Sequence, residues 1–199
     1  MFIKNEIDRS LTFRRSCGVG LCGSCAMNIN GVNRLACITP VPPVGDLTVF
    51  PLPHSYVIKD LVVDMTNFHR QYQTIQPWLQ RKRRKSADTK EYLQSVRDRK
   101  KLDGLYECTL CGCCSFACPT YWHHGTGKKC FLGPAAILQA YRWIIDSRDE
   151  FHTERLARLK NSVYKCRKIV NCTNACPMVL IMAIYYRFNN KYIIGNGLL

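Results

Sequence analysis

Apolar and polar residues follow two different periodicities along the chain. In the early part, residues 26–31 (Ala-Met-Asn-Ile-Asn-Gly) alternate into an Asn-Gly pair. Alternation that ends in Asn-Gly is a β-hairpin signal. We therefore expect a small sheet near the start of the chain.

The later part has apolar residues at helical spacing instead. Residues 56–80 carry such a stripe, and it consists of Ile58, Leu61, Val62, Met65, Phe68 and Tyr72. A second stripe covers residues 134–147 and begins with a proline, which suits a first helical turn. Residues 150–160 resemble a third helix. These stripes predict a helical region with its own core.

A proline-rich stretch lies between the two regions. Its prolines are Pro40, Pro42, Pro43, Pro51 and Pro53. Such a stretch marks an irregular connector. We therefore predict an α+β protein of two domains, residues 1–55 and residues 56–199.

Cysteine content changes the picture, because the 199 residues include 13 cysteines. Disulfide scaffolds are usually short and secreted. The N-terminus Met-Phe-Ile-Lys-Asn-Glu lacks the apolar core and cleavage site of a signal peptide. We therefore expect metal ligation in a reducing compartment.

The formal net charge is +15, and the basic excess is concentrated. Residues 81–101 hold ten Lys or Arg and three Asp or Glu, and they begin with the run Arg81-Lys82-Arg83-Arg84-Lys85. Such a run suits nucleic acid or anionic lipid, but charge blocks are commonly just solvated linkers. We favour the linker and expect no nucleic-acid partner.

No stretch approaches the ~20 apolar residues that cross a bilayer. The longest candidate, residues 178–186, is too short and predicts a buried or interfacial helix.

The cysteines after residue 100 form two matching runs. The first is Cys108-x2-Cys111-x2-Cys114-x3-Cys118-Pro119, the bacterial-ferredoxin spacing. The second is Cys166-x2-Ile169-x2-Cys172-x3-Cys176-Pro177, with isoleucine in slot two. In two-cluster ferredoxins the fourth cysteine of each run ligates the other cluster.

This exchange assigns the ligands. One cluster receives four thiolates and is predicted to be 4Fe–4S; its ligands are Cys108, Cys111, Cys114 and Cys176. The other receives three, because Ile169 supplies none, and is predicted to be 3Fe–4S; its ligands are Cys118, Cys166 and Cys172. A labile fourth iron held by solvent remains an alternative.

The early cysteines have the plant-type spacing C-x4-C-x2-C followed by a distant fourth. They predict a 2Fe–2S cluster on Cys17, Cys22, Cys25 and Cys37. Cys113 and Cys130 are left over, and we interpret them as packed, unligated thiols. The alternative for the whole set is zinc, but zinc sites favour separated cysteine pairs.

The chemistry expected is electron transfer. The five histidines are scattered (His54, His69, His123, His124 and His152), and no nucleophile–base pair is evident. No GxGxxG or P-loop occurs, so neither flavin nor nucleotide is expected on this chain. Electrons must then enter from one partner and leave to another.

Several long stretches resemble the iron–sulfur subunit of succinate dehydrogenase, respiratory complex II, whose close relative is fumarate reductase. They are Leu11-Thr12-Phe13-Arg14-Arg15-Ser16-Cys17, residues 22–30, residues 51–60, Leu102-Asp103-Gly104-Leu105-Tyr106-Glu107-Cys108, and residues 141–149. The resemblance covers nearly all of residues 2–177.

The resemblance implies a ferredoxin-like β-grasp domain followed by a helical two-cluster ferredoxin domain. It implies electrons taken from an FAD flavoprotein that oxidises succinate, and delivery to ubiquinone beside membrane-anchor subunits of the cytochrome b type. It implies a role in the tricarboxylic acid cycle and respiratory chain, at the matrix face of the mitochondrial inner membrane or the cytoplasmic face of a bacterial one. It also implies the cluster ligands assigned above.

The chain departs from the family pattern at three places. The family's first β-grasp strands lie before the point that matches Met1, so we expect a second polypeptide, or sequence beyond that given, to supply them. On the quinone side His123 stands where the family has a second tryptophan, and Arg167 stands where it has histidine. The tail after Pro177 differs as well. The quinone site is expected at Pro119, Thr120, Trp122, His123, Arg167 and Ile169.

Two alternatives differ in function. The same subunit could run backwards in a quinol:fumarate reductase, since sequence does not fix the direction. A metal-bound nucleic-acid module would instead use the basic run.

Overall fold

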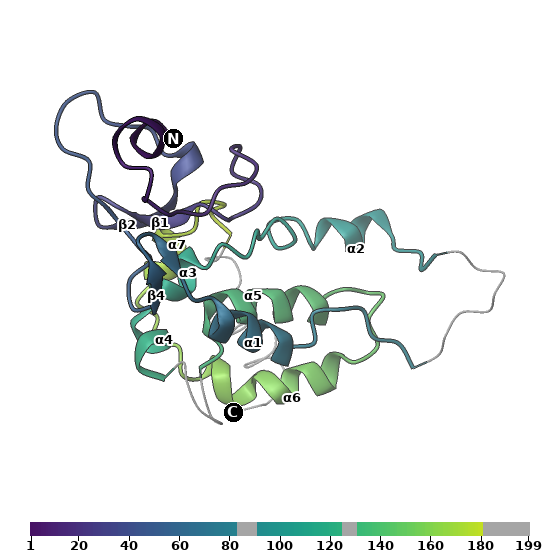
Figure 1. Cartoon of the computed structure of the whole chain (residues 1–199). Helices are drawn as coiled ribbons and strands as arrows, with labels where there is room; N and C mark the ends of the chain where they lie inside the picture. The colour runs from purple at the N-terminus through teal and green to yellow at the C-terminus, as the bar shows by residue number, and fades with distance from the viewer. Residues whose placement is uncertain (83–90, 125–130, 181–199) are drawn as a thin grey trace.

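The strands of the chain come before its long helices, as Figure 1 shows in the computed structural model. The structure describes residues 1–82, 91–124 and 131–180. Its helical and strand elements in chain order are η1 Ile3–Ile7, β1 Ala26–Ile29, β2 Val32–Leu35, η2 Ala36–Ile38, β3 Val49–Phe50, β4 Val57–Lys59, β5 Val62–Val63, α1 Thr66–Thr74, α2 Val96–Lys100, α3 Cys113–Phe116, α4 Pro119–His124, α5 Gly133–Ile144, α6 His152–Val163 and α7 Asn171–Asn174. The α+β prediction is confirmed.

The first sheet is antiparallel, with strand order β2-β1-β3. Asn30 (φ 50°) and Gly31 (φ 81°) form the turn between β1 and β2. Positive φ at both central residues is what a tight hairpin turn requires, and Asn-Gly adopts it readily. The hairpin predicted at residues 26–31 is therefore confirmed.

The sheet draws its strands from residues 26–50. Within residues 1–25 the assigned element is η1, a single π-type turn with no buried residue. The expectation that further strands join this sheet from elsewhere stays a prediction.

The helix predicted over residues 56–80 is confirmed only for α1, Thr66–Thr74, and is wrong before and after it. Residues 57–63 form a second hairpin, β4–β5, and α1 begins only at Thr66. The β-branched residues Val57, Ile58, Val62 and Val63 prefer strands. Asp60 turns the chain with φ 46°. The Asp64 carboxylate then accepts the Thr66 N–H at 2.8 Å and starts the helix.

The β4–β5 turn holds the N-terminal segment. Thr12 N–H donates to the Asp60 carboxylate at 2.7 Å, and Leu61 N–H donates to the Thr12 carbonyl at 3.2 Å. Residues 57–63 therefore pack with the first domain. The domain boundary between residues 55 and 56 stays a prediction.

Helix α5 lies at the centre of the helical region and contacts α1, α3 and α6. Figure 1 shows α1, α5 and α6 side by side below the first sheet. The helices predicted at residues 134–147 and 150–160 are confirmed as α5 and α6. Their buried apolar faces build the main core, with Leu105, Leu138, Tyr141, Ile144 and Leu159 among its members.

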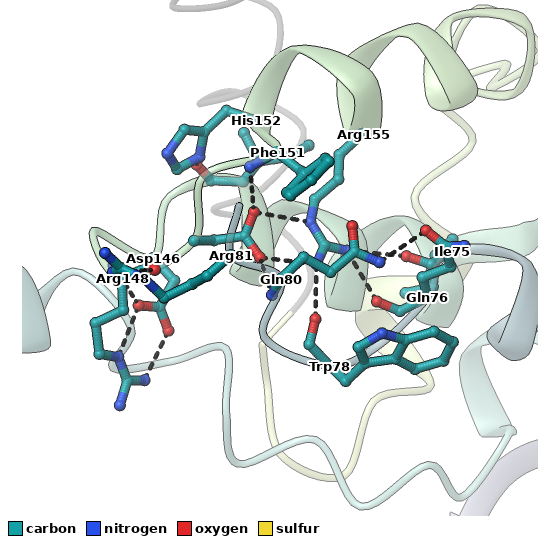
Figure 2. Close-up of polar contacts among 12 residues, drawn as sticks. Ile75, Gln76, Trp78, Gln80, Arg81, Asp146, Arg148, Phe151, His152 and Arg155 are labelled. Atoms are coloured by element: carbon teal, nitrogen blue, oxygen red, sulfur yellow. Dashed lines mark hydrogen bonds and ion pairs between the residues drawn. The ribbon is translucent and has the colours of Figure 1, made fainter. Parts of the chain in front are cut away.

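A buried ion pair fastens the segment after α1 to the turn between α5 and α6 (Figure 2). Arg155 Nη2 lies 2.8 Å from Asp149 Oδ2, and both side chains are almost wholly buried. The guanidinium also donates to three main-chain carbonyls, at 3.0, 2.9 and 2.7 Å, those of Ile75, Gln76 and Trp78. Because the pair is fully hydrogen-bonded, its burial is tolerated.

The two regions meet through β2 and α3. The Asn33 side-chain amide donates to the Cys113 carbonyl at 3.1 Å, and both residues are buried. The described residues contain no helix long and apolar enough to cross a membrane. The apolar stretch predicted at residues 178–186 lies outside the described residues after Leu180, whereas Met178 and Leu180 pack against the main core.

Candidate iron–sulfur sites

The four early cysteines lie together in one loop system. Cys17 and Cys22 each donate a backbone N–H to the other's sulfur at 3.4 Å. Gly20 N–H donates to Cys37 Sγ at 3.2 Å. Cys25 hydrogen-bonds with Cys37. The loop thus brings the four predicted 2Fe–2S ligands into contact in two pairs.

Three glycines shape this loop. Gly18, Gly20 and Gly23 have φ of 75°, 78° and 70°, which side chains disfavour. The left-handed turns aim backbone N–H groups at the sulfurs. Hydrogen bonds from Ser24 and then Cys17 lower the pKa of Cys22 to about 6, which favours the thiolate that a metal needs.

A second set of four cysteines lines one cavity in the helical region. The set consists of Cys108, Cys111, Cys114 and Cys176, and the other walls include Leu110, Ala135, Leu138 and Leu180. Burial raises the pKa of Cys108, and the nearby Cys111 and Cys176 thiols raise it further. These are the four predicted 4Fe–4S ligands, and Cys176 comes from the other run.

The remaining three predicted ligands also lie together. Burial raises the pKa of Cys172 to about 11, and its neighbours Cys118 and Cys166 add to the rise. Burial likewise raises the pKa of Cys118, with Cys166 contributing. The Cys172 thiol contributes to the raised pKa of Cys114, so this group adjoins the second set.

Ile169 occupies an exposed turn beside these three thiols in sequence. It is 50% exposed, between Lys168 (φ 60°) and Val170 (φ 70°). The corresponding position of the first run is Cys111, which lines the cavity. A side chain without a metal-binding atom therefore stands where the first run has a predicted ligand.

The residues expected at the quinone site come from two segments. Pro119, Thr120, Trp122 and His123 lie on α4, directly after Cys118. Thr120 is buried and His123 is exposed. Arg167 and Ile169 are exposed residues of the loop after Cys166. Cys118, Trp122 and Cys166 pack against one shared apolar cluster, so the segments converge beside the three-thiol group.

His54, an exposed residue, is a neighbour of this region. Its ring stacks on Trp122 with centroids 3.5 Å apart, and Trp122 Nε1 donates to the Phe116 carbonyl at 2.9 Å. The backbone of His54 is in the left-handed region, with φ 56°. No spacing in the sequence links residues 54 and 122, so only the fold could reveal this contact.

Cys113 is buried, as predicted for a packed thiol. It hydrogen-bonds to Cys111, which lowers the pKa of Cys111 to about 7 and raises that of Cys113 itself. Cys130, the other leftover cysteine, lies outside the described residues.

The residues present fit iron–sulfur clusters. The twelve described cysteines are all free thiols. The Thr109 side chain hydrogen-bonds to Cys111 in the cavity wall and helps to lower the pKa of that thiol, which favours the thiolate that a cluster needs. Within the described residues no three His, Cys, Asp or Glu side chains converge as one metal ion would require. A cluster spreads its ligands over several irons.

The basic run is only partly described. Arg81 is 2.7 Å from Glu150, and its guanidinium lies over the Tyr92 ring. Residues 83–90, which include Arg83, Arg84 and Lys85, lie outside the described part. Arg81 is thus engaged within the protein.

Comparisons with known proteins match two parts of the chain to iron–sulfur domains. Residues 1–70 match the family model of the 2Fe-2S iron-sulfur cluster binding domain, and residues 107–181 match that of the 4Fe-4S dicluster domain. A chain of the structure titled "Mycobacterium smegmatis Sdh1 complex in the apo form" has the same fold. The TM-score is 0.81 at 22% identity, over 98% of this chain and 82% of that one.

Proposed function

We propose that this chain, a 2Fe–2S domain followed by a 4Fe–4S dicluster domain, is the electron-transfer subunit of a succinate:ubiquinone oxidoreductase. It takes electrons from an FAD flavoprotein that oxidises succinate and passes them to ubiquinone. The resemblance of its sequence to that family and the shared fold with a chain of the Sdh1 complex support this assignment.

The observation that carries the proposal is the way the thiols segregate. The thiols form groups of four, four and three. Cys176, from the second run, lies with the first three thiols of the first run. Cys118, from the first run, lies with Cys166 and Cys172 of the second. This exchange is the arrangement of two-cluster ferredoxins. We assign 2Fe–2S, 4Fe–4S and 3Fe–4S clusters to the three groups in chain order of their first cysteines.

The bound clusters supply one-electron carriers whose potentials depend on cluster type, hydrogen bonds and exposure. The chain positions them. Exposed thiols of Cys17 and Cys22 put the first site at the surface, open to a flavoprotein. Helix α4 and the loop after Cys166 lie beside the last site, which supports a quinone site there, and the exposed His123 can donate a hydrogen bond to a quinone.

The setting follows from this role. We propose a peripheral position on the matrix face of the mitochondrial inner membrane, or on the cytoplasmic face of a bacterial one. The partners are the flavoprotein and membrane anchors of the cytochrome b type. Purification of the native complex tests both, and a chain that co-purifies with nucleic acid and no flavoprotein would contradict the assignment.

Visible absorption and low-temperature EPR of the purified protein test the clusters directly. Oxidised protein is expected to show a 3Fe–4S signal, and reduced protein is expected to show 2Fe–2S and 4Fe–4S signals. Absence of the oxidised-state signal would exclude the three-thiol cluster.

The variant Ile169→Cys tests the ligand slot. It is expected to convert the 3Fe–4S cluster to 4Fe–4S, seen as loss of the oxidised-state EPR signal and a gain of one iron. Val170→Cys is the matched control, because Val170 is exposed in the same turn but outside the slot. If both variants keep the 3Fe–4S signal, the slot assignment is wrong.

The reverse direction, quinol-driven fumarate reduction, uses the same residues. Assays of the complex in both directions separate the two activities.

A further inference from the structure

The first two ligand loops touch at Gly23. Gly23 lies between the ligands Cys22 and Cys25 of the first site. A Cβ built on Gly23 would lie 2.8 Å from the Thr109 carbonyl oxygen and 3.0 Å from both Cα and Cβ of Cys111. Cys111 is a ligand of the second site, so one loop rests directly on the other.

This contact leaves no room for a side chain. Real Cβ atoms essentially never approach other atoms within 3.0 Å, and here the obstacle is main chain that cannot rotate away. Gly23 also has φ +70°, which side chains rarely adopt. Any other residue would push the two loops apart.

A second contact secures the same junction. Asn33 on β2 donates to the Cys113 carbonyl at 3.1 Å, two residues beyond Cys111. The bond is buried, and the Asn28 side chain in turn donates to Asn33 Oδ1 at 2.9 Å. Breaking a buried bond of this kind leaves unpaired groups and is costly. The sheet is therefore fixed against α3 next to the loop contact.

We propose that Gly23 is the positioning residue of the electron junction between the first and second clusters. Its missing side chain lets the Cys22–Cys25 loop seat on Cys111, so electrons cross one van der Waals gap between the ligand loops. The inference rests on the proposed function. Each crossing oxidises the 2Fe–2S cluster by one electron and reduces the 4Fe–4S cluster by one, with no bond or proton change; reduced flavin on the partner supplies the electron.

The test compares Gly23→Ala with Gly31→Ala in the assembled complex. Gly31 has φ +81°, and a Cβ at this position would have nothing within 4 Å, so its variant carries the same backbone strain without a collision. The readout is EPR power saturation of the dithionite-reduced clusters, because neighbouring paramagnets speed each other's relaxation more strongly when closer. Succinate-driven quinone reduction is the second readout.

Gly23→Ala is expected to weaken the relaxation enhancement and slow quinone reduction at full cluster content, whereas Gly31→Ala changes neither. Equal relaxation in the two variants, with both clusters present, would overturn the junction. If Gly23→Ala fails to assemble its 2Fe–2S cluster, Asn33→Ala decides: weaker relaxation supports the junction, and unchanged relaxation refutes it. Wild-type protein without clusters would instead defeat the proposed function.

Discussion

The first and second cysteine sites each bring four thiols together, but they do so in different structural settings. In the sheet domain, Cys17 and Cys22 are exposed, and backbone N–H groups of a glycine-rich loop approach the sulfurs. In the helical domain, Cys114 is buried, and Cys108 and Cys176 pack against the main core. The first site is a loop displayed by a small sheet, whereas the second is part of the core itself.

This difference indicates in which domain the folding stability depends on cluster binding. Losing a metal group costs folding energy where its ligands also organise the fold. The helical domain should therefore depend on its cluster more than the sheet domain does. Substitutions in the two domains can break or sharpen this contrast.

Cys114→Ala is expected to have the largest effect. It removes one of the four predicted second-site ligands and leaves a gap in the helical core. We expect loss of the 4Fe–4S cluster together with loss of helical circular dichroism. Iron content and thermal unfolding measure the two losses.

Cys22→Ala is the matched variant in the sheet domain. Because Cys22 is exposed, the variant should lose the 2Fe–2S signal while the helical signal and the other clusters stay. If the two variants unfold the helices equally, the contrast between the sites does not hold.

Arg155→Met tests the polar fastening of the helical domain. It leaves the buried Asp149 carboxylate unpaired and removes bonds to the segment after α1 (Figure 2). Breaking a buried pair in this way costs about 3–5 kcal/mol. Urea unfolding followed by circular dichroism measures the change.

The control is Glu150→Gln, which breaks the Arg81–Glu150 pair, whose side chains are 29% and 33% exposed. Such partly exposed pairs contribute at most about 1 kcal/mol. A cost for Arg155→Met no larger than that of the control would show that the buried pair does not fasten the domain.

Gly31→Ala should have the smallest effect. The hairpin turn needs φ +81° there, and the site is open, so only backbone strain is added. The cost should be about 1 kcal/mol in the sheet domain. Thermal unfolding monitored at the 2Fe–2S absorption measures it, and an unchanged midpoint would indicate that the turn relaxes.

Local patterns predicted much of the fold. The Asn30-Gly31 turn carries its own conformational preference, and the helix at residues 134–147 has a proline start and a full apolar face. Residues 56–65 were mispredicted as helix, because Ile58, Leu61 and Val62 fit helical spacing as well as a short hairpin. The hairpin is favoured by the turn at Asp60 and by the bond from Thr12 to the Asp60 carboxylate, which joins residues far apart in sequence.

The sequence by itself predicted the ligand sets, because the spacing of the two ferredoxin-type runs indicates which thiols share a cluster. The absence of a ligand at Ile169 was readable in the same way. Only the tertiary structure decided how the sites meet. The contact of Gly23 with Cys111, the Asn33–Cys113 bond and the His54–Trp122 stack each join residues more than 60 positions apart. Such contacts depend on how whole elements pack, and no local spacing encodes that packing.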